Sequence, residues 1–373
     1  MAVKTNYEKN GKKYFRITRT IGKKADGTPI KKEFYGNSKS EAEEKANNYI
    51  NKLKTGLELD FDSVTLNDLI KRWLFDVLFV SENIKPSTFQ RYEGIYRNYI
   101  KESKIASLKL YQIKSINIQI YYNELFKNGK KTTQIKELNK VLKCFFNYAL
   151  KENYIQKNPC TSIEIPGNKT DKMKNREVEI LNEKELKILI KNLEDHKFKL
   201  LFLMALGTGL RQGELLALDW EDINFSDNTV SVSKSVKRVY EYKNENEKRL
   251  VYKFQSPKSI KSIRTIPIPN NIIVLLKKEK NKTGLIFNDN NNILSAKIVY
   301  YEWKKLLKQS NLKNMKFHAL RHTYASKLLE NGVDVKTVSD LLGHSDITIT
   351  QIYLHSSDKL KQTAINKIDY LFD

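Results

Sequence analysis

Near its start the chain alternates apolar and polar side chains, a pattern typical of β-strands. Residues 14–22 and 30–36 alternate in this way. A helical pattern follows over residues 38–54, where we expect Ser40 to cap the helix because acidic residues fill the turn after it. These elements predict a small three-stranded sheet with one helix, folded as a domain over residues 1–57.

The helical period returns after a polar stretch at residues 55–63, which we interpret as a linker. Thr65 and Asp68 have the spacing of a capping box at the start of the next helix. Helices are predicted over residues 64–74, 86–100, 116–126 and 132–153. In the last of them an apolar stripe recurs at helical spacing, formed by Ile135, Leu138, Leu142, Phe145 and Ala149. The pattern predicts an all-helical domain over residues 64–165.

A second polar and basic stretch, residues 165–177, contains a Pro-Gly pair and predicts another linker. The remaining residues, 178–373, begin with helices and then break into strands. The strands are predicted over residues 228–240, 248–256 and 262–269, and the later helices over 271–280, 295–309, 318–332 and 334–344. We therefore expect a mainly helical domain with a small antiparallel sheet, and a multidomain α+β chain as a whole.

The last residues, 356–373, form an amphipathic pattern of their own. Leu360, Ala364, Ile368 and Phe372 recur every four residues, as on one face of a short helix. A helix this short is marginal alone in water, so its apolar face must dock on protein. The pattern leaves two alternatives open, docking on a neighbouring subunit and docking on its own domain.

The charge balance indicates a polyanionic partner. The chain has 373 residues, with 67 Lys and Arg against 43 Asp and Glu, a formal net charge of +24. Residues 1–32 contain ten Lys and Arg but two Asp and Glu, a net of +8, whereas residues 33–56 contain four of each. The positive charge falls on the predicted strands, as expected if the sheet contacts phosphates and the helix braces its back. The alternative is a small solvated sheet.

Composition also bears on where the protein works. No run approaches the roughly 20 apolar residues that span a bilayer, and charges stand where a signal peptide would be apolar. We expect a soluble intracellular protein without a membrane partner. The two cysteines, Cys144 and Cys160, have neither paired nor metal-like spacing, and we expect Cys144 to be a buried helix residue.

The segment FHALRHTYAS places His318, Arg321 and His322 close together on a predicted helix. A helical zinc site of the H-E-x-x-H type needs a glutamate where this chain has Ala319, and an arginine between the ligands opposes a cation. A phosphate fits better, because His318 and Arg321 lie three apart on one face and both donate to anionic oxygens. His322 lies one position further round the helix, where its side chain either points into the site or packs and hydrogen-bonds beneath it. A solvated face is the third alternative.

Three further segments carry residues suited to the same chemistry. Arg211 follows a glycine-rich turn at a helix start, with Glu214 one turn later. Lys258 lies in a tight turn between strands. His344 precedes Tyr353 by nine residues. Arginine, lysine, His-x-x-Arg, histidine and tyrosine in this order resemble the tyrosine recombinases, the phage integrase family, and the resemblance covers essentially the whole chain.

The resemblance implies an arm-type DNA-binding domain over residues 1–57, a helical SAM-like core-binding domain over 64–165 and a catalytic domain over 178–373. This layout looks like that of integrases from temperate phages and integrative conjugative elements. It implies a site-specific recombinase that cleaves and rejoins DNA to integrate, and also to excise, a mobile element. Such a protein would work in the bacterial cytoplasm, associated with the nucleoid when acting.

The family's roles carry over to matching positions. Arg211 and Arg321 would clamp the scissile phosphate and stabilise its transition state. Tyr353 would attack phosphorus, leaving a 3′-phosphotyrosyl link and a free 5′-hydroxyl. Lys258 would protonate the departing 5′-oxygen, and Lys261 in the same turn is the alternative.

The remaining residues would support these. His318 would help to manage the tyrosine proton, because a phenol of pKa about 10 is a poor nucleophile while protonated. His344 would hydrogen-bond a phosphate oxygen, and Glu214 would orient the arginine or the histidine. Tyr324, close to the histidine segment, is a decoy for the nucleophile.

The implied chemistry needs no cofactor. Exchanging one phosphodiester for another conserves the bond energy, no Walker-type phosphate loop occurs in the sequence, and two arginines can replace a metal. The implied partners are double-stranded DNA at core and arm-type attachment sites, further copies in a tetrameric synaptic complex, and an excisionase or a host DNA-bending protein. A type IB topoisomerase-like enzyme and a catalytically idle DNA-binding regulator are the rival interpretations. The N-terminal domain opposes the first, and the complete set of site residues opposes the second.

Overall fold

The structure is a computed structural model, which describes residues 7–9, 11–23, 28–54, 64–81, 83–167, 178–256, 262–279, 283–290 and 292–353. The chain divides into two compact units. The first comprises residues 1–173 with 243–247, and the second comprises residues 174–242 with 248–373. The predicted linkers lie wholly or largely outside the described residues, so the division into three domains stays a prediction.

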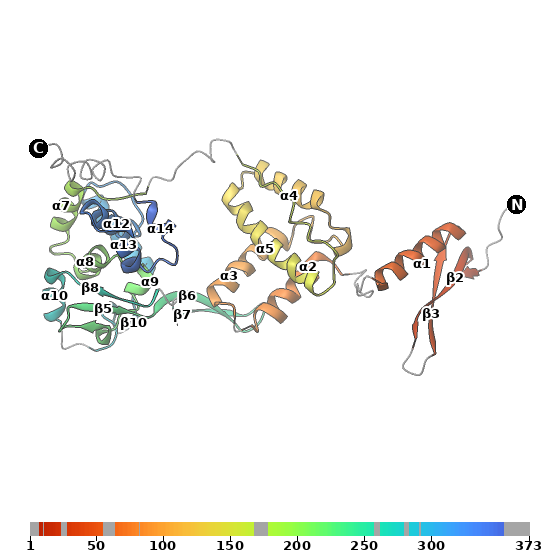
Figure 1. The fold of residues 1–373 in the computed structure, drawn as a ribbon, viewed down its shortest axis with the longest axis horizontal. Helices are drawn as coiled ribbons and strands as arrows, with labels where there is room; N and C mark the ends of the chain where they lie inside the picture. The colour runs from red at the N-terminus through yellow and green to blue at the C-terminus, as the bar shows by residue number, and fades with distance from the viewer. Residues whose placement is uncertain are drawn as a thin grey trace, which may run out of the picture. The chain divides into compact units, whose positions relative to one another are not determined.

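At the N-terminus a three-stranded antiparallel sheet packs against one helix (Figure 1). The elements are β1 (Tyr7–Lys9), β2 (Lys12–Lys23), β3 (Pro29–Gly36) and α1 (Lys39–Lys54). Phe34 of β3 and the small residues Ala42 and Ala46 of α1 are buried. The predicted sheet and helix are confirmed, but the expected cap at Ser40 is wrong. The hydroxyl of Ser38 accepts the backbone N–H of Glu41 at 3.1 Å, so the helix begins before Ser40.

Residues 64–167 form a bundle of helices. They are α2 (Leu66–Arg72), α3 (Pro86–Ile95), α4 (Ser115–Lys127) and α5 (Thr132–Lys151), with π-helices η2 (Trp73–Leu78) and η3 (Tyr96–Ile100) and the 3-10 helix η4 (Leu110–Gln112). The capping box is confirmed, because Thr65 Oγ1 accepts from the backbone of Asp68 and the Asp68 carboxylate accepts from that of Thr65. Four predicted helices are therefore present.

Helix α5 supplies the centre of this bundle. Every residue of the predicted apolar stripe is fully buried, namely Ile135, Leu138, Leu142, Phe145 and Ala149. The indole of Trp73 meets the ring of Phe145 edge-on, with 5.6 Å between ring centroids. Cys144 is exposed, so its predicted burial is wrong. One position before Phe145 is about 100° round the helix, which carries the thiol off the buried face.

The second unit is mainly helical. Its helices are α7 (Glu183–Asn192), α8 (Lys199–Thr208), α9 (Gln212–Leu215), α10 (Asn270–Lys277), α11 (Ala296–Gln309), α12 (Ala319–Glu330), α13 (Val335–Leu342) and α14 (Thr348–Gln351), with the 3-10 helix η5 (Trp220–Asp222). Helix α12 packs against α8 and α13, and α13 packs against strand β8 (Figure 1). Phe202, Trp303 and Phe317 lie in the core, where the Trp303 indole donates to the Met315 carbonyl at 3.0 Å.

The strands of this unit form small antiparallel sheets. They are β4 (Ile223–Asn224), β5 (Thr229–Val232) and β8 (Arg264–Pro267) in the order β4-β5-β8, the hairpin β6 (Ser235–Tyr242) with β7 (Lys248–Gln255), and the pair β9 (Asn288–Asp289) with β10 (Asn292–Ile293). The strand predicted over residues 228–240 is thus divided between two sheets. Val232 and Val236 are buried, and Lys234, which pairs with Asp222 at 3.2 Å, lies in the break between β5 and β6.

No helix among the described residues has the length and apolar character needed to cross a membrane. The amphipathic stretch predicted at residues 356–373 lies outside the described residues, so its docking stays a prediction.

We predict that Phe145→Ala destabilises the helical bundle by about 3–5 kcal/mol, because it leaves a cavity at a fully buried position. Cys144→Ala is the matched control one residue away, and it should change the stability by less than about 0.5 kcal/mol because Cys144 is exposed. Urea unfolding followed by circular dichroism measures both. Equal effects of the two substitutions would contradict the described orientation of α5.

Candidate active site

The guanidinium group of Arg321 is buried within the second unit. Arg321, on α12, is only 2% exposed. Its Nη1 donates to the carbonyl of Gly209, and its Nη2 donates to the carbonyl of Leu342, both at 2.7 Å. These carbonyls end helices α8 and α13, where the last C=O groups have no partner within the helix. Arg321 thus satisfies two helix ends at once and is fixed by them.

Arg211 stands at the start of α9, immediately before Gln212–Leu215. Its Nη1 donates to Glu214 Oε1 at 2.8 Å, and its Nη2 donates to the carbonyl of Gly343 at 3.2 Å. The backbone N–H of Arg211 also donates to Glu214 Oε2 at 3.0 Å. The predicted pairing of Glu214 with an arginine is present, and it orients the Arg211 side chain from the first turn of its own helix.

A third arginine, Arg264 of β8, joins the same group. Its Nη2 donates to Glu214 Oε2 at 2.9 Å, and its Nε donates to the carbonyl of Leu341 at 2.7 Å. The side chains of Arg264 and Glu214 are 6% and 7% exposed. Glu214 therefore bridges two arginines, and β8 is attached to the end of α13.

Two glycines make this arrangement possible. Gly209 and Gly343 follow α8 and α13 with φ of 63° and 65°, a left-handed conformation that ends a helix and that side chains disfavour. A Cβ on Gly209 would lie 2.4 Å from Cδ1 of Tyr324, and one on Gly343 would lie 3.0 Å from Arg264. Both positions therefore need glycine for backbone conformation and for space.

His344 follows Gly343 and is 7% exposed. Its Nδ1 is 2.8 Å from Oγ1 of Thr350, which is fully buried on α14. The backbone N–H of Tyr353 donates to the carbonyl of Thr350 at 3.1 Å. His344 and the segment that carries Tyr353 are thus held together through one threonine.

The hydroxyl of Tyr353 is held by a histidine of α12. Tyr353 is 2% exposed, and its Oη lies 2.7 Å from Nδ1 of His322. The ring of His318 meets the His322 ring edge-on, with 4.7 Å between centroids. The structure gives His322 a hydrogen bond, but its partner is Tyr353 of the candidate site and not a group beneath the site.

Burial and positive charge together set the protonation states. Burial and, to a smaller degree, the charge of Arg211 together lower the pKa of Arg321 to about 9, so the guanidinium stays charged near neutral pH. Desolvation by the protein around its ring, with the charges of His322 and Arg321, lowers the pKa of His318 to about 4, although the residue keeps an accessible surface. Burial and the arginines also lower the pKa of His344 to about 4. The site therefore presents charged arginines beside neutral histidines.

The same burial and positive charge also shift the pKa values of Glu214 and Tyr353. Burial opposes the ionisation of Glu214, but the hydrogen bond and charge of Arg264, with the charge of Arg211, hold the carboxyl pKa below its usual value. Burial raises the pKa of the Tyr353 hydroxyl, and Arg321 and Arg211 offset only part of this rise. The tyrosine is therefore protonated near neutral pH.

The structure brings together Arg211, Glu214, His318, Arg321, His344 and Tyr353, all singled out in the sequence. Lys258 and its alternative Lys261 lie outside the described residues. Within the described ranges, no group of three or more His, Cys, Asp and Glu side chains is arranged to hold a metal ion.

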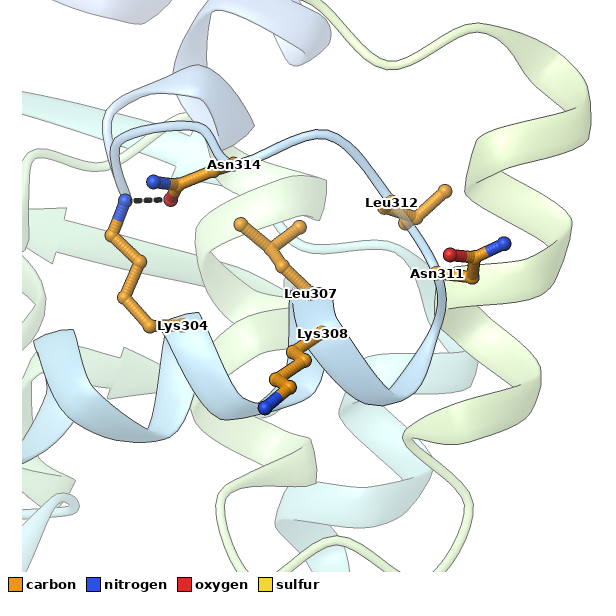
Figure 2. A pocket seen from close by; sticks show the side chains of 6 residues that line it. All are labelled: Lys304, Leu307, Lys308, Asn311, Leu312 and Asn314. Atoms are coloured by element: carbon orange, nitrogen blue, oxygen red, sulfur yellow. Dashed lines mark hydrogen bonds between the residues drawn. The ribbon is translucent and has the colours of Figure 1, made fainter.

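A separate cavity of about 390 Å³ lies at the end of α11 (Figure 2). It is lined by Lys304, Leu307, Lys308, Asn311, Leu312 and Asn314. Lys304 reaches across to the side chain of Asn314 and donates to the carbonyl of Met315 at 3.2 Å. The cavity shares no residue with the cluster of Arg211, Arg264 and Arg321. We therefore take this cluster, and not the cavity, as the candidate site.

Comparison with known proteins places the chain in a family. The phage integrase family matches residues 179–359, and the N-terminal SAM-like domain of phage integrases matches residues 65–126. A XerC-like tyrosine recombinase of Caldanaerobacter subterraneus subsp. tengcongensis is 45% identical, over 100% of both chains. The chain belongs to the tyrosine recombinase family. As a tyrosine recombinase it breaks and rejoins DNA through a tyrosine nucleophile.

More distant matches of this tyrosine recombinase include a sequence relative and two solved structures of similar fold. XerD of Rickettsia bellii is 26% identical over 73% of this chain and 88% of its own. The Tn1549 transposon integrase, solved with transposon right end DNA, has a TM-score of 0.64 at 20% identity and covers 82% of this chain and 100% of its own. A lambda integrase dimer bound to a COC′ core site has a TM-score of 0.56 at 21% identity, over 93% of each chain. The predicted fold class is confirmed.

Sequence reasoning missed Arg264 and Thr350 and left His322 open. Arg264 stands six residues after Lys258 in an alternating strand, where an arginine is ordinarily a solvated side chain. Thr350 lies in the run ITIT, whose spacing singles out neither threonine. Its position one helical turn before Tyr353 is the only available signal.

We predict that the recombinase loses stability between about pH 7 and about pH 5, in part through His344. Its pKa is about 4 when folded, below the ordinary histidine value, so the unfolded chain binds the proton first and unfolding is favoured as pH falls. The contribution is about 1–2 kcal/mol over this range. His344→Asn keeps an acceptor beside Thr350 but does not titrate. Thermal unfolding should therefore depend less on pH in this variant, and an unchanged dependence would contradict the buried neutral state.

Proposed function

We propose that this tyrosine recombinase integrates and excises a mobile DNA element by using Tyr353 as its nucleophile. The observation that carries the proposal is the arrangement of Arg211, Arg321 and His344 around helix ends beside a buried tyrosine. Two fixed guanidinium groups form a site for one phosphodiester, whose negative charge increases in the transition state.

In this proposal Arg211 and Arg321 bind the non-bridging oxygens of the scissile phosphate. Arginine has five N–H donors, and the two carbonyl bonds found among the described residues leave three on Arg321 for the phosphate. Glu214 keeps Arg211 in place, and Arg264 keeps Glu214 charged. Because the donors are positioned before DNA arrives, little reorganisation is needed at the moment of reaction.

The covalent step transfers the phosphoryl link from DNA to protein. Oη of Tyr353 attacks phosphorus, the bond to the 5′-oxygen breaks, and a 3′-phosphotyrosine remains. Lys258 protonates the departing 5′-oxygen, and His344 donates to a phosphate oxygen. His318 acts in acid–base catalysis. The reverse reaction, with a 5′-hydroxyl of another strand, rejoins the DNA without an external energy source.

The choice of a mobile element over other substrates has separate support. The solved structures with the same fold include a transposon integrase with transposon end DNA and a lambda integrase on a core site. Residues 1–32 carry a net charge of +8, and the basic strand β2 is largely exposed. We infer that the N-terminal sheet binds arm-type DNA while the other parts bind the core site. We further propose that the protein assembles as a tetramer on nucleoid DNA in the bacterial cytoplasm, together with an excisionase or a DNA-bending protein.

We predict that Tyr353→Phe abolishes covalent adducts with DNA while leaving the DNA affinity within about threefold, because only one hydroxyl is lost. A nicked suicide duplex carrying the junction between the element and the chromosome traps the adduct. Tyr324→Phe is the matched control and should form adducts as the unmodified protein does. Adduct formation by Tyr353→Phe would refute the assignment of the nucleophile.

We also predict that deletion of residues 1–56 leaves cleavage of a short core duplex intact but reduces integration by about tenfold or more, because a basic DNA contact outside the core site is lost. A recombination assay on full attachment sites, run beside cleavage of the short duplex, measures both. The affinity of the intact protein for arm DNA should fall steeply with salt, with a log–log slope of roughly −0.9 per phosphate neutralised. Equal integration by both proteins would exclude a separate role for the N-terminal sheet.

A further inference from the structure

His322 contacts the atom that reacts. Its Nδ1 is 2.7 Å from Oη of Tyr353, and the two ring centroids are 5.5 Å apart. Tyr353 is 2% exposed, so bulk water has almost no access to its side chain. A proton leaving this hydroxyl therefore needs an acceptor inside the protein, and the imidazole of His322 is already within hydrogen-bond distance.

The protonation states favour transfer in this direction. Burial and Arg321 lower the pKa of His322, so its imidazole is neutral near pH 7 and one ring nitrogen carries a lone pair. The phenol is protonated, because burial raises its pKa. In the tautomer that carries its proton on Nε2, the neutral imidazole accepts the hydrogen bond of the protonated phenol at Nδ1.

His318 and His322 occupy different places in the site. His318 stands at the boundary before α12 with an exposed side chain, whereas His322 lies within the first turns of the helix and is half-buried. The two rings meet edge-on. His318 is therefore open to incoming DNA, while His322 lies on the protein side of the nucleophile.

We propose that His322 accepts the phenolic proton of Tyr353 as Oη attacks the scissile phosphate. This inference rests on the proposed function of Tyr353. The O–H bond breaks and its proton moves to Nδ1, the Oη–P bond forms, and the P–O5′ bond breaks with its electron pair on the 5′-oxygen, which takes a proton from the general acid of the proposed mechanism. On rejoining, the imidazolium of His322 returns the proton to Oη. His322 thereby takes the acid–base role that the proposed function gives to His318, and His318 hydrogen-bonds the phosphate instead.

The test separates accepting a hydrogen bond from accepting a proton. His322→Asn places an amide oxygen close to the position of Nδ1, where it can accept the bond from Tyr353 but cannot take the proton. We expect the rate of adduct formation on the nicked suicide duplex to fall by about 100-fold, within the range for losing a general base, with DNA affinity unchanged. Replacing Tyr353 with a difluorotyrosine, whose phenol is more acidic, should restore about tenfold or more of the rate in this variant.

Each outcome is decisive. If His322→Asn cleaves within about threefold of the unmodified protein, or if the acidic phenol restores nothing, His322 is not the proton acceptor. If the variant fails to bind DNA, His322→Ala in the presence of free imidazole takes its place, and only a proton-accepting role predicts that imidazole restores cleavage. Failure of the proposed function would look different, because the unmodified protein would then form no adduct or Tyr353→Phe would form one.

Discussion

Three buried or half-buried arginines share the carbonyl oxygens at the end of one short helix, and the catalytic unit is arranged around that contact. The carbonyls of Leu341, Leu342 and Gly343 accept from Arg264, Arg321 and Arg211 respectively. Like charges this close repel one another, and burial adds a desolvation cost. The negative end of the α13 dipole and the carboxylate of Glu214 offset these costs. The result is a preformed positive site.

That contact also explains why segments distant in the sequence meet. Arg321 joins the end of α8 to the end of α13, and Arg264 joins β8 to α13. His344 follows directly after the shared helix end and hydrogen-bonds the hydroxyl of Thr350, whose carbonyl accepts the backbone N–H of Tyr353. The segment that carries Tyr353 is thus held in place through His344. Tyr353, the proposed nucleophile, is therefore positioned by the same helix end as the arginines that we propose bind the phosphate. A phosphate bound between the arginines would replace the missing negative charge and relieve their repulsion.

Much of the fold could be predicted from the sequence, because patterns of one or two residue types determine its helices and strands. The apolar stripe of α5 and the Thr65 capping box follow from helical periodicity and spacing. The order of the proposed site residues along the chain leads to the tyrosine recombinase family, which the comparisons confirm. Cys144 is exposed and not buried as predicted, because one position on a helix changes exposure and the apolar stripe does not show where the buried face ends. The helix is capped by Ser38 and not by Ser40 as predicted, because two serines two residues apart offer the same capping hydroxyl. Arg264 could not be found because its partners, the Leu341 carbonyl and the carboxylate of Glu214 fifty residues away, are brought to it only by the fold.

The most direct measurement is a pair of crystal structures, one of the protein alone and one with a nicked duplex that carries the scissile phosphate. A preformed site predicts that Arg321 keeps its bonds to the carbonyls of Gly209 and Leu342 in both structures, while its other donors and those of Arg211 take the phosphate within reach of Tyr353. An Arg321 side chain that leaves either carbonyl to reach the DNA, or a phosphate bound away from Tyr353, would contradict the account.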